Sequence, residues 1–218
     1  MRDEAAALLG GRVIENPVSG ERILIHETAA HEKAAPHKAA PHKAAQADGA
    51  LLAWELFLAP GGRVPSSHAH PEQEECFTVL EGRMRFRVGG RRITAGPGDT
   101  VLVPPGTVHH FANAGPRPAR VAVQTWPALS MLQLLETAAA MARAQHAAAR
   151  RLPSPVDLAL FMRDFEREVR APYLPAALVR AVIRPAAWLA GRCGLDARYR
   201  RLRGVPSPSG RNRHGVGR

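Results

Sequence analysis

Three histidines and one glutamate in the middle of the chain have the residue types of a metal site. His68 and His70 stand two positions apart, Glu75 comes shortly after them, and His109 lies further along the chain. Side chains two positions apart on an extended segment point to the same face, so the first two imidazoles should project together. Pro71 helps to turn the chain before Glu75 begins the next strand. A Pro-Pro-Gly turn precedes His109, which brings a third imidazole from elsewhere in the sheet.

The ligand chemistry of this set favours particular metals. Neutral imidazoles with one carboxylate suit a divalent first-row transition metal, namely Fe, Mn, Ni, Cu or Zn. Magnesium and calcium prefer oxygen ligands and fit less well. Four protein ligands leave about two positions of an octahedral ion open to water or substrate, which distinguishes the site from a closed structural zinc site. A single carboxylate leaves the ion with positive charge, so an anionic ligand would be favoured.

Other polar residues nearby are not expected to bind the metal. On a strand, His110 would point away from the site, and Cys76 should face away from the neighbouring carboxylate. Glu72 and Glu74 are expected in the connecting loop as solvated carboxylates.

Short strands must hold the four ligands in place. Residues 50–127 are dense in apolar runs separated by Gly and Pro, a pattern typical of a sandwich or barrel. In RMRFRV the apolar Met84, Phe86 and Val88 alternate with arginines, so one face of that strand should be buried. The next strand expected after the Gly-Gly turn at 89–90 is TVLVP. Two more short strands are expected in 11–29, around an Asn-Pro-Val-Ser-Gly turn.

Two motifs contain the four candidate ligands. From Gly62 the sequence reads G-x5-H-x-H-x4-E-x6-G, and from Gly98 it reads G-x5-P-x-G-x2-H-x3-N, ending at Asn113. These spacings match the two signature motifs of the cupin superfamily at every marked position, so the segment resembles a single-domain cupin. The resemblance implies a mainly β fold: a double-stranded β-helix, or jelly-roll barrel, extending roughly from 11 to 127. A C-terminal α-helical extension would follow it.

The superfamily that this segment resembles contains several functions, so the fold alone does not settle the activity. It includes dioxygenases, isomerases, decarboxylases, seed-storage proteins and small-ligand sensors, and the complete ligand set makes its metal-free members poorer models. The first hypothesis is a non-haem metal-dependent oxygenase acting on a small organic molecule. The alternatives are a non-catalytic metallocupin that binds or senses a small ligand, and a metal-dependent isomerase or lyase. Catalytic residues stay unassigned; the residues expected to line the barrel interior and a substrate pocket are Phe77, Met84, Phe86 and Phe111.

The hydrophobic pattern changes to a helical period at about residue 128. Apolar residues from Met131 to Met141 recur at helical spacing, and Ser154 followed by Pro155 resembles a helix start. One apolar face is then expected from residues Leu158, Phe161, Phe165 and Val169. Residues 174–195 are apolar, but arginines and a proline interrupt them, so no clean membrane-spanning run exists.

The sequence predicts four regions. Residues 1–49 hold the first strands and an AAPHK repeat, whose His31, His37 and His42 are expected to lie in a loop of no chemical consequence. The barrel core spans 50–127, joined by the strands in 11–29. A helical extension covers 128–203, and 204–218 is expected to be a disordered basic tail.

Charge and composition limit the partners. The formal net charge is +11, but seven arginines and one acid lie between Asp196 and the end, so more than half of the excess lies in residues 196–218. No nucleic-acid motif accompanies it, and we expect no specific nucleic-acid partner. Peripheral membrane contact is the less favoured reading of 174–203. Two cysteines and no signal peptide predict a cytoplasmic protein. Because open sheet edges need cover, we expect a homodimer, with a small molecule as its ligand or substrate.

Overall fold

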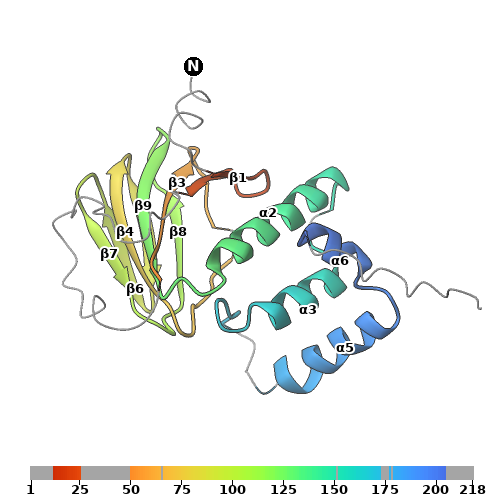
Figure 1. Ribbon diagram of the computed structural model, residues 1–218. Helices are drawn as coiled ribbons and strands as arrows, with labels where there is room; N and C mark the ends of the chain where they lie inside the picture. Colours follow the sequence, from red (N-terminus) through yellow and green to blue (C-terminus); the bar gives the residue numbers. More distant parts are fainter. Residues whose placement is uncertain are drawn as a thin grey trace, which may run out of the picture.

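The computed structural model describes residues 12–25, 50–64, 66–150, 152–172, 177 and 179–204. Strands form a barrel on one side of the molecule and helices gather on the other side (Figure 1). The AAPHK repeat and the part of the predicted basic tail beyond Gly204 lie outside the described residues.

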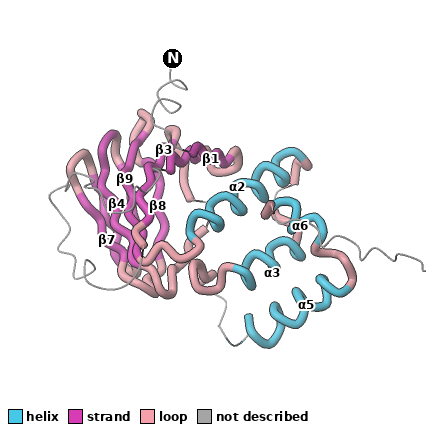
Figure 2. The backbone as a smooth tube through the Cα atoms, in the orientation of Figure 1, coloured by secondary structure: helices cyan, strands magenta, loops and turns pink. Residues whose placement is uncertain are grey.

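Nine strands form two antiparallel sheets in the described part of the chain (Figure 2). The six-stranded sheet has the order β1-β2-β3-β9-β4-β7 and the three-stranded sheet has the order β6-β5-β8. The strands are β1 (Arg12–Asn16), β2 (Glu21–Ile25), β3 (Leu52–Leu58), β4 (Glu74–Glu81), β5 (Met84–Val88), β6 (Arg91–Ala95), β7 (Thr100–Val103), β8 (His109–Asn113) and β9 (Ala119–Trp126). The first two strands therefore lie in the same sheet as β3, which pairs along its other side with β9.

One strand was not predicted from the sequence. Residues Arg91–Ala95 form β6, which pairs with β5 and makes one edge of the smaller sheet. Its five residues RRITA include two exposed arginines, and only Ala95 is fully buried. An edge strand needs little apolar surface, which explains why the hydrophobic pattern did not indicate it.

The barrel interior is filled by side chains that alternate along the strands. In β5, Met84 and Phe86 are buried whereas Arg85 and Arg87 are exposed, as the alternation predicts. Phe86 packs against Phe77 of β4, with ring centroids 5.4 Å apart. This close packing of large apolar groups supplies most of the stabilisation of a barrel.

A glycine is required at the turn between β4 and β5. Gly82 has φ +83°, and a Cβ there would lie 2.8 Å from the Cα of Ala119. Any side chain would therefore strain the backbone and clash with β9. This glycine closes the first of the two sequence motifs.

The helices follow the barrel in the chain. The helical elements are α2 (Met131–Ala147), α3 (Pro155–Asp164), a π-helical turn (Val179–Ile183), α5 (Arg184–Arg192) and α6 (Ala197–Leu202). Helix α2 runs beside β1, where Arg143 donates a 3.0 Å hydrogen bond to the carbonyl of Glu15. Among the described residues, no helix is long and apolar enough to cross a membrane.

The apolar face expected for 158–169 was only partly right. Pro155 does begin α3, and Ser154 precedes it without a side-chain capping bond. Leu158 is 41% exposed, whereas Leu160 is the buried leucine of this helix. The helix ends at Asp164. Phe165 is buried, but it belongs to the segment that follows the helix and not to the helix itself.

Candidate metal centre

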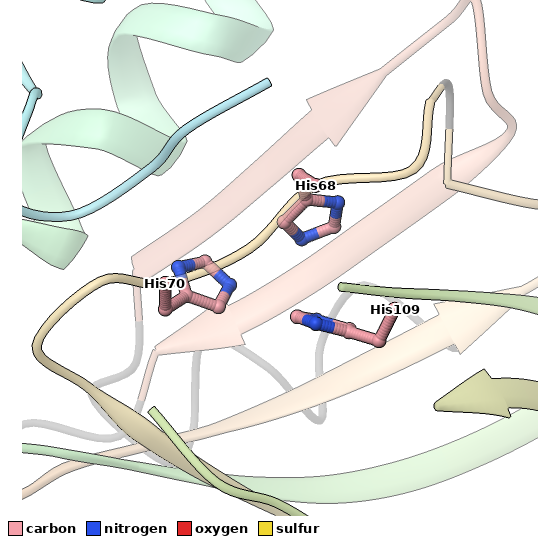
Figure 3. Close-up of side chains that lie close together, drawn as sticks. All are labelled: His68, His70 and His109. Carbon is pink, nitrogen blue, oxygen red and sulfur yellow. The ribbon is translucent and has the colours of Figure 1, made fainter. Parts of the chain in front are cut away.

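The structure brings the three predicted histidines together. The rings of His68, His70 and His109 gather around a common space (Figure 3). One nitrogen from each ring lies within 4.8 Å of the others. His70 and His109 are buried, and His68 is partly exposed. The three histidines are therefore positioned to bind one metal ion, as the sequence predicts.

Backbone pairing holds two of these segments in register. His68 and His109 form an antiparallel bridge, in which each amide donates to the other carbonyl at 3.1 and 2.8 Å. The amide of Gly106 donates to the carbonyl of His70 at 2.7 Å. The short segment that carries two of the histidines is thus tied to β8 and to the turn before it.

The protonation pattern of the three rings follows from their hydrogen bonds. The Nδ1 atoms of His68 and His109 lie 3.0 Å from the carbonyls of Ser66 and Thr107, and that of His70 contacts the carbonyl of Glu168. A carbonyl can only accept, so every Nδ1 must carry its proton. In a neutral ring this leaves each Nε2 with a free lone pair, the form that binds metals.

Glu75 faces two of these lone pairs. Its Oε2 lies 3.2 Å from Nε2 of His70 and 3.1 Å from Nε2 of His109. These separations are short enough for hydrogen bonds, yet both buried nitrogens lack a partner while the rings are neutral. A carboxylate facing two lone pairs is repulsive unless a cation or a proton lies between them. Glu75 therefore lies close to two members of the three-histidine group, which is the group positioned to hold an ion.

The distances from Glu75 to two of the histidines also fit a shared metal. Adjacent ligands of an octahedral ion with bonds of about 2.1 Å lie about 3.0 Å apart. The two distances from Glu75 Oε2 are close to this value. Its other oxygen, Oε1, accepts a long 3.5 Å hydrogen bond from Thr125, whose hydroxyl accepts one from Trp54. This contact orients the carboxylate towards the histidines.

The electrostatics keep most of the ligands ready for a metal. Burial, together with the neighbouring His109 and His70, moves the pKa of His68 far below its usual value. For Glu75, burial favours the neutral acid, but the adjacent histidines outweigh it and hold its pKa well below the usual range. Burial also lowers the pKa of His70, but the Glu75 carboxylate outweighs it and the net shift is upward. Without metal, a proton on His70 would neutralise the carboxylate.

The helical extension contributes a contact that sequence reasoning missed. The carbonyl of Glu168 accepts the Nδ1 proton of His70. Beside it, Ala69 and Arg170 exchange two backbone hydrogen bonds of 3.0 and 2.8 Å. The carboxylate of Glu168 is buried and accepts from the amide of Ser130, 3.0 Å away. No sequence signal could have revealed a backbone acceptor, because every residue type has a carbonyl.

The four apolar residues expected to line a pocket pack together inside the barrel. Phe77, Met84, Phe86 and Phe111 are at most 5% exposed. The ring of Phe77 lies 5.4 Å from that of Phe111 and 6.3 Å from that of His109. These side chains thus form an apolar wall next to the histidines, and none of them lines the two described cavities.

Among the described residues, the neighbouring polar side chains do not belong to the three-histidine group. His110 contacts the hydroxyl of Ser67 at 3.2 Å, and Cys76 is buried. Glu72 is exposed and forms a bidentate ion pair with Arg167. Glu74 was expected in the loop, but it is the first residue of β4. The repeat histidines at 31, 37 and 42 lie outside the described residues.

The last marked residue of the second motif has a structural role. Asn113 is buried, and its Nδ2 donates to the carbonyls of Leu58, Ala59 and Arg117. Its Oδ1 accepts from the amide of Gly115 at 2.8 Å. Asn113 thus fixes the end of the strand that begins with His109.

Comparisons with known proteins match the barrel segment. An uncharacterized protein of Methanocaldococcus jannaschii is 30% identical over 73 residues, which cover 34% of this chain and 58% of the relative's length. A double-stranded β-helix protein of Klebsiella pneumoniae is 27% identical over 37% of this chain and 70% of its own, with a TM-score of 0.34. KdgF from a Halomonas species is 18% identical over 52% and 84%, with a TM-score of 0.40.

The TM-scores are low, so the assignment rests on the sequence family and on the site. The family model described as "Cupin domain" matches residues 54–125, which run from β3 into β9. Both sequence motifs lie in or next to this range, and three of their residues converge in the structure. The barrel segment is therefore a cupin domain, and a C-terminal helical extension follows it in the chain.

Proposed function

We propose that this protein is a non-haem metal-dependent oxygenase that acts on a small organic molecule. The ligands would be His68, His70, Glu75 and His109. One observation supports metal binding most strongly: all three Nδ1 atoms donate to carbonyls, which leaves Nε2 of each ring for a metal, and Nε2 of His70 and of His109 lie 3.2 and 3.1 Å from the Glu75 carboxylate.

A first-row metal bound there would supply Lewis acidity and, if redox-active, electrons for reaction with oxygen. The protein's own residues would orient the ligands and exclude water. The three carbonyl contacts fix the ring orientations, and Thr125 fixes the carboxylate. The apolar wall formed by Phe77 and its neighbours keeps water away from one side. Oε1 of Glu75 accepts from Thr125 and Oε2 faces the histidine nitrogens, which favours a ligand role over that of a general base.

A second candidate function is a metallocupin that binds or senses a small ligand without catalysis. The contact between His70 and the carbonyl of Glu168 favours it, because a change at the metal could be passed directly to the helices. A metal-dependent isomerase or lyase would use the same four ligands, with the metal acting only as a Lewis acid.

The test is elemental analysis of tag-free protein, comparing wild type with the double variant His68→Ala/Glu75→Ala. We expect near-stoichiometric Fe, Mn, Ni or Cu in wild type and none in the variant. His110→Ala is the matched control, because that histidine points to Ser67 and should not change metal content. Full metal occupancy in the double variant would rule out the ligand assignment.

Oxygen-uptake measurements on the metal-loaded protein then separate the candidates. Uptake with a panel of small organic acids and enols, lost in the double variant, would support the oxygenase. Zinc as the only metal would favour the isomerase or lyase instead. Ligand binding without turnover, in protein loaded with a redox-active metal, would favour the sensor.

A further inference from the structure

A cavity of about 720 Å³ lies between the barrel and the helices. The β1–β2 turn and the loop after β3 form one wall, and helices α2 and α3 form the other. Its size is within the range of about 300–1,000 Å³ that is typical of small-molecule sites. The lining residues that matter for the argument are Val18, Arg63, Ser66, Ala138, Leu152 and Leu158.

Large apolar side chains gather around this cavity and remain accessible to water. Val18 is 46% exposed, Leu152 is 76% exposed and Leu158 is 41% exposed. They come from three separate parts of the chain and line the same cavity. Covering this apolar surface would be favourable, so the cavity suits a ligand with an apolar body.

The charge that lines the cavity also indicates the kind of ligand. Arg63 is the only charged residue among the described residues that line it. Its side chain is exposed and makes no ion pair within the described part of the chain. Ser66 adds a hydroxyl at the same wall. The cavity is lined by apolar and neutral polar side chains, the latter including Asn16, Ser19 and Gln145, with one guanidinium and no described acid. This favours an organic anion, which Arg63 would bind through both oxygens of a carboxylate.

The cavity is separate from the metal centre but touches its support. None of the four candidate ligands and none of the four interior apolar residues lines it. Ser66, however, lines it and also accepts the Nδ1 proton of His68. A ligand in the cavity would therefore contact a residue that orients a metal-binding histidine.

We propose that this cavity binds a small organic anion with an apolar body, with its charge on Arg63 and its hydrocarbon part against the helices. The inference goes beyond the proposed function, because the anion would bind here whatever chemistry the metal performs.

The test is calorimetric titration of the full chain with octanoate and with octan-1-ol, which share an apolar body and differ in charge. Octanoate should bind at one site, and octan-1-ol should bind about tenfold more weakly because it cannot pair with the guanidinium. Arg63→Gln should weaken the binding of octanoate about tenfold and leave the binding of octan-1-ol unchanged. Arg92→Gln removes the same charge from an exposed strand position and should change neither affinity.

Two more variants make the proposal decisive. Ala138→Phe fills the cavity from α2 and should weaken the binding of both ligands. Circular dichroism checks that the variant is folded. His68→Ala should leave octanoate binding intact, because the anion does not bind the metal. If octanoate binding is lost in His68→Ala and kept in Arg63→Gln, the carboxylate binds the metal and the cavity proposal is wrong, while the proposed function stands. Equal binding of octanoate and octan-1-ol would also overturn it.

Discussion

The barrel and the helical extension bury their side chains in different ways. In the barrel, large residues such as Phe77, Leu56 and Val121 are fully buried between the two sheets. In the extension, α5 buries the small Ala187 and Ala190 and leaves Trp188 62% exposed.

Other parts of the extension do bury large side chains, among them Phe165 and Tyr199, so the contrast with the barrel is confined to α5, while the barrel carries the candidate ligands. The extension adds little apolar packing at α5, but it contacts the candidate metal centre through the backbone of Glu168 and Arg170.

The strongest test of the barrel's role is His109→Ala. Removing a ligand should reduce metal affinity by more than the 10–100-fold that is typical of outer contacts, so we expect a loss of more than about 100-fold. The variant should still fold, because the Phe77 cluster remains in place. Metal titration and thermal unfolding measure the two effects. Full metal stoichiometry would show that the site is wrongly assigned.

The role of the extension is tested by Glu168→Ala. The change leaves the amide of Ser130 without its acceptor and frees the segment that holds His70. We expect metal affinity to fall by about 10-fold and the free energy of unfolding to fall by about 1–3 kcal/mol. Glu168→Gln is the matched control, since its amide oxygen can still accept. An unchanged affinity in Glu168→Ala would mean that the barrel alone orients His70.

The pH dependence of metal binding sharpens the same comparison. Because Glu75 raises the pKa of His70, the metal-free protein keeps a proton on this ring up to a higher pH than a free histidine would, and the metal must displace that proton. Below that raised pKa, affinity should fall by about tenfold for each pH unit of acidification. Above it, affinity should level off, since His70 is already neutral. Titrations between about pH 6 and pH 8 would measure this, and a flat profile would contradict it.

The smallest effect is expected from Arg167→Ala. Arg167 pairs with Glu72 beside the metal centre, and both side chains are exposed. Exposed ion pairs contribute little to stability, so metal affinity and unfolding should hardly change. Chemical denaturation and metal titration check this. A clear loss of affinity would mean that this contact, rather than Glu168, holds the extension against the barrel.

The barrel and the metal site could be predicted because their signals are local. His68 and His70 share a face by strand alternation, and the same rule separates Phe86 from Arg87. The motif spacings fixed which residues to consider. The edge strand β6 was not predicted because its exposed side chains leave no apolar alternation in the sequence.

The helices were harder to predict because their contacts are not local. Leu158 and Leu160 are the same residue type, so their apolar character does not distinguish them. Only the packing of α3 decides that Leu160 is the one that is buried. The contact from Glu168 to His70 uses a backbone carbonyl, which carries no residue-specific signal. Tertiary context, rather than propensity, determined both outcomes.

The pairing of Ala69 with Arg170 also bears on how the protein is made. His70 and its acceptor at Glu168 are 98 positions apart in the chain. During synthesis the barrel emerges from the ribosome before the helices, and contacts between distant segments form late because closing a long loop costs entropy. A nascent barrel would therefore hold its histidines while the ring of His70 still lacks its backbone partner. The site would reach its full metal affinity only when the last third of the chain has been translated and has packed against the barrel.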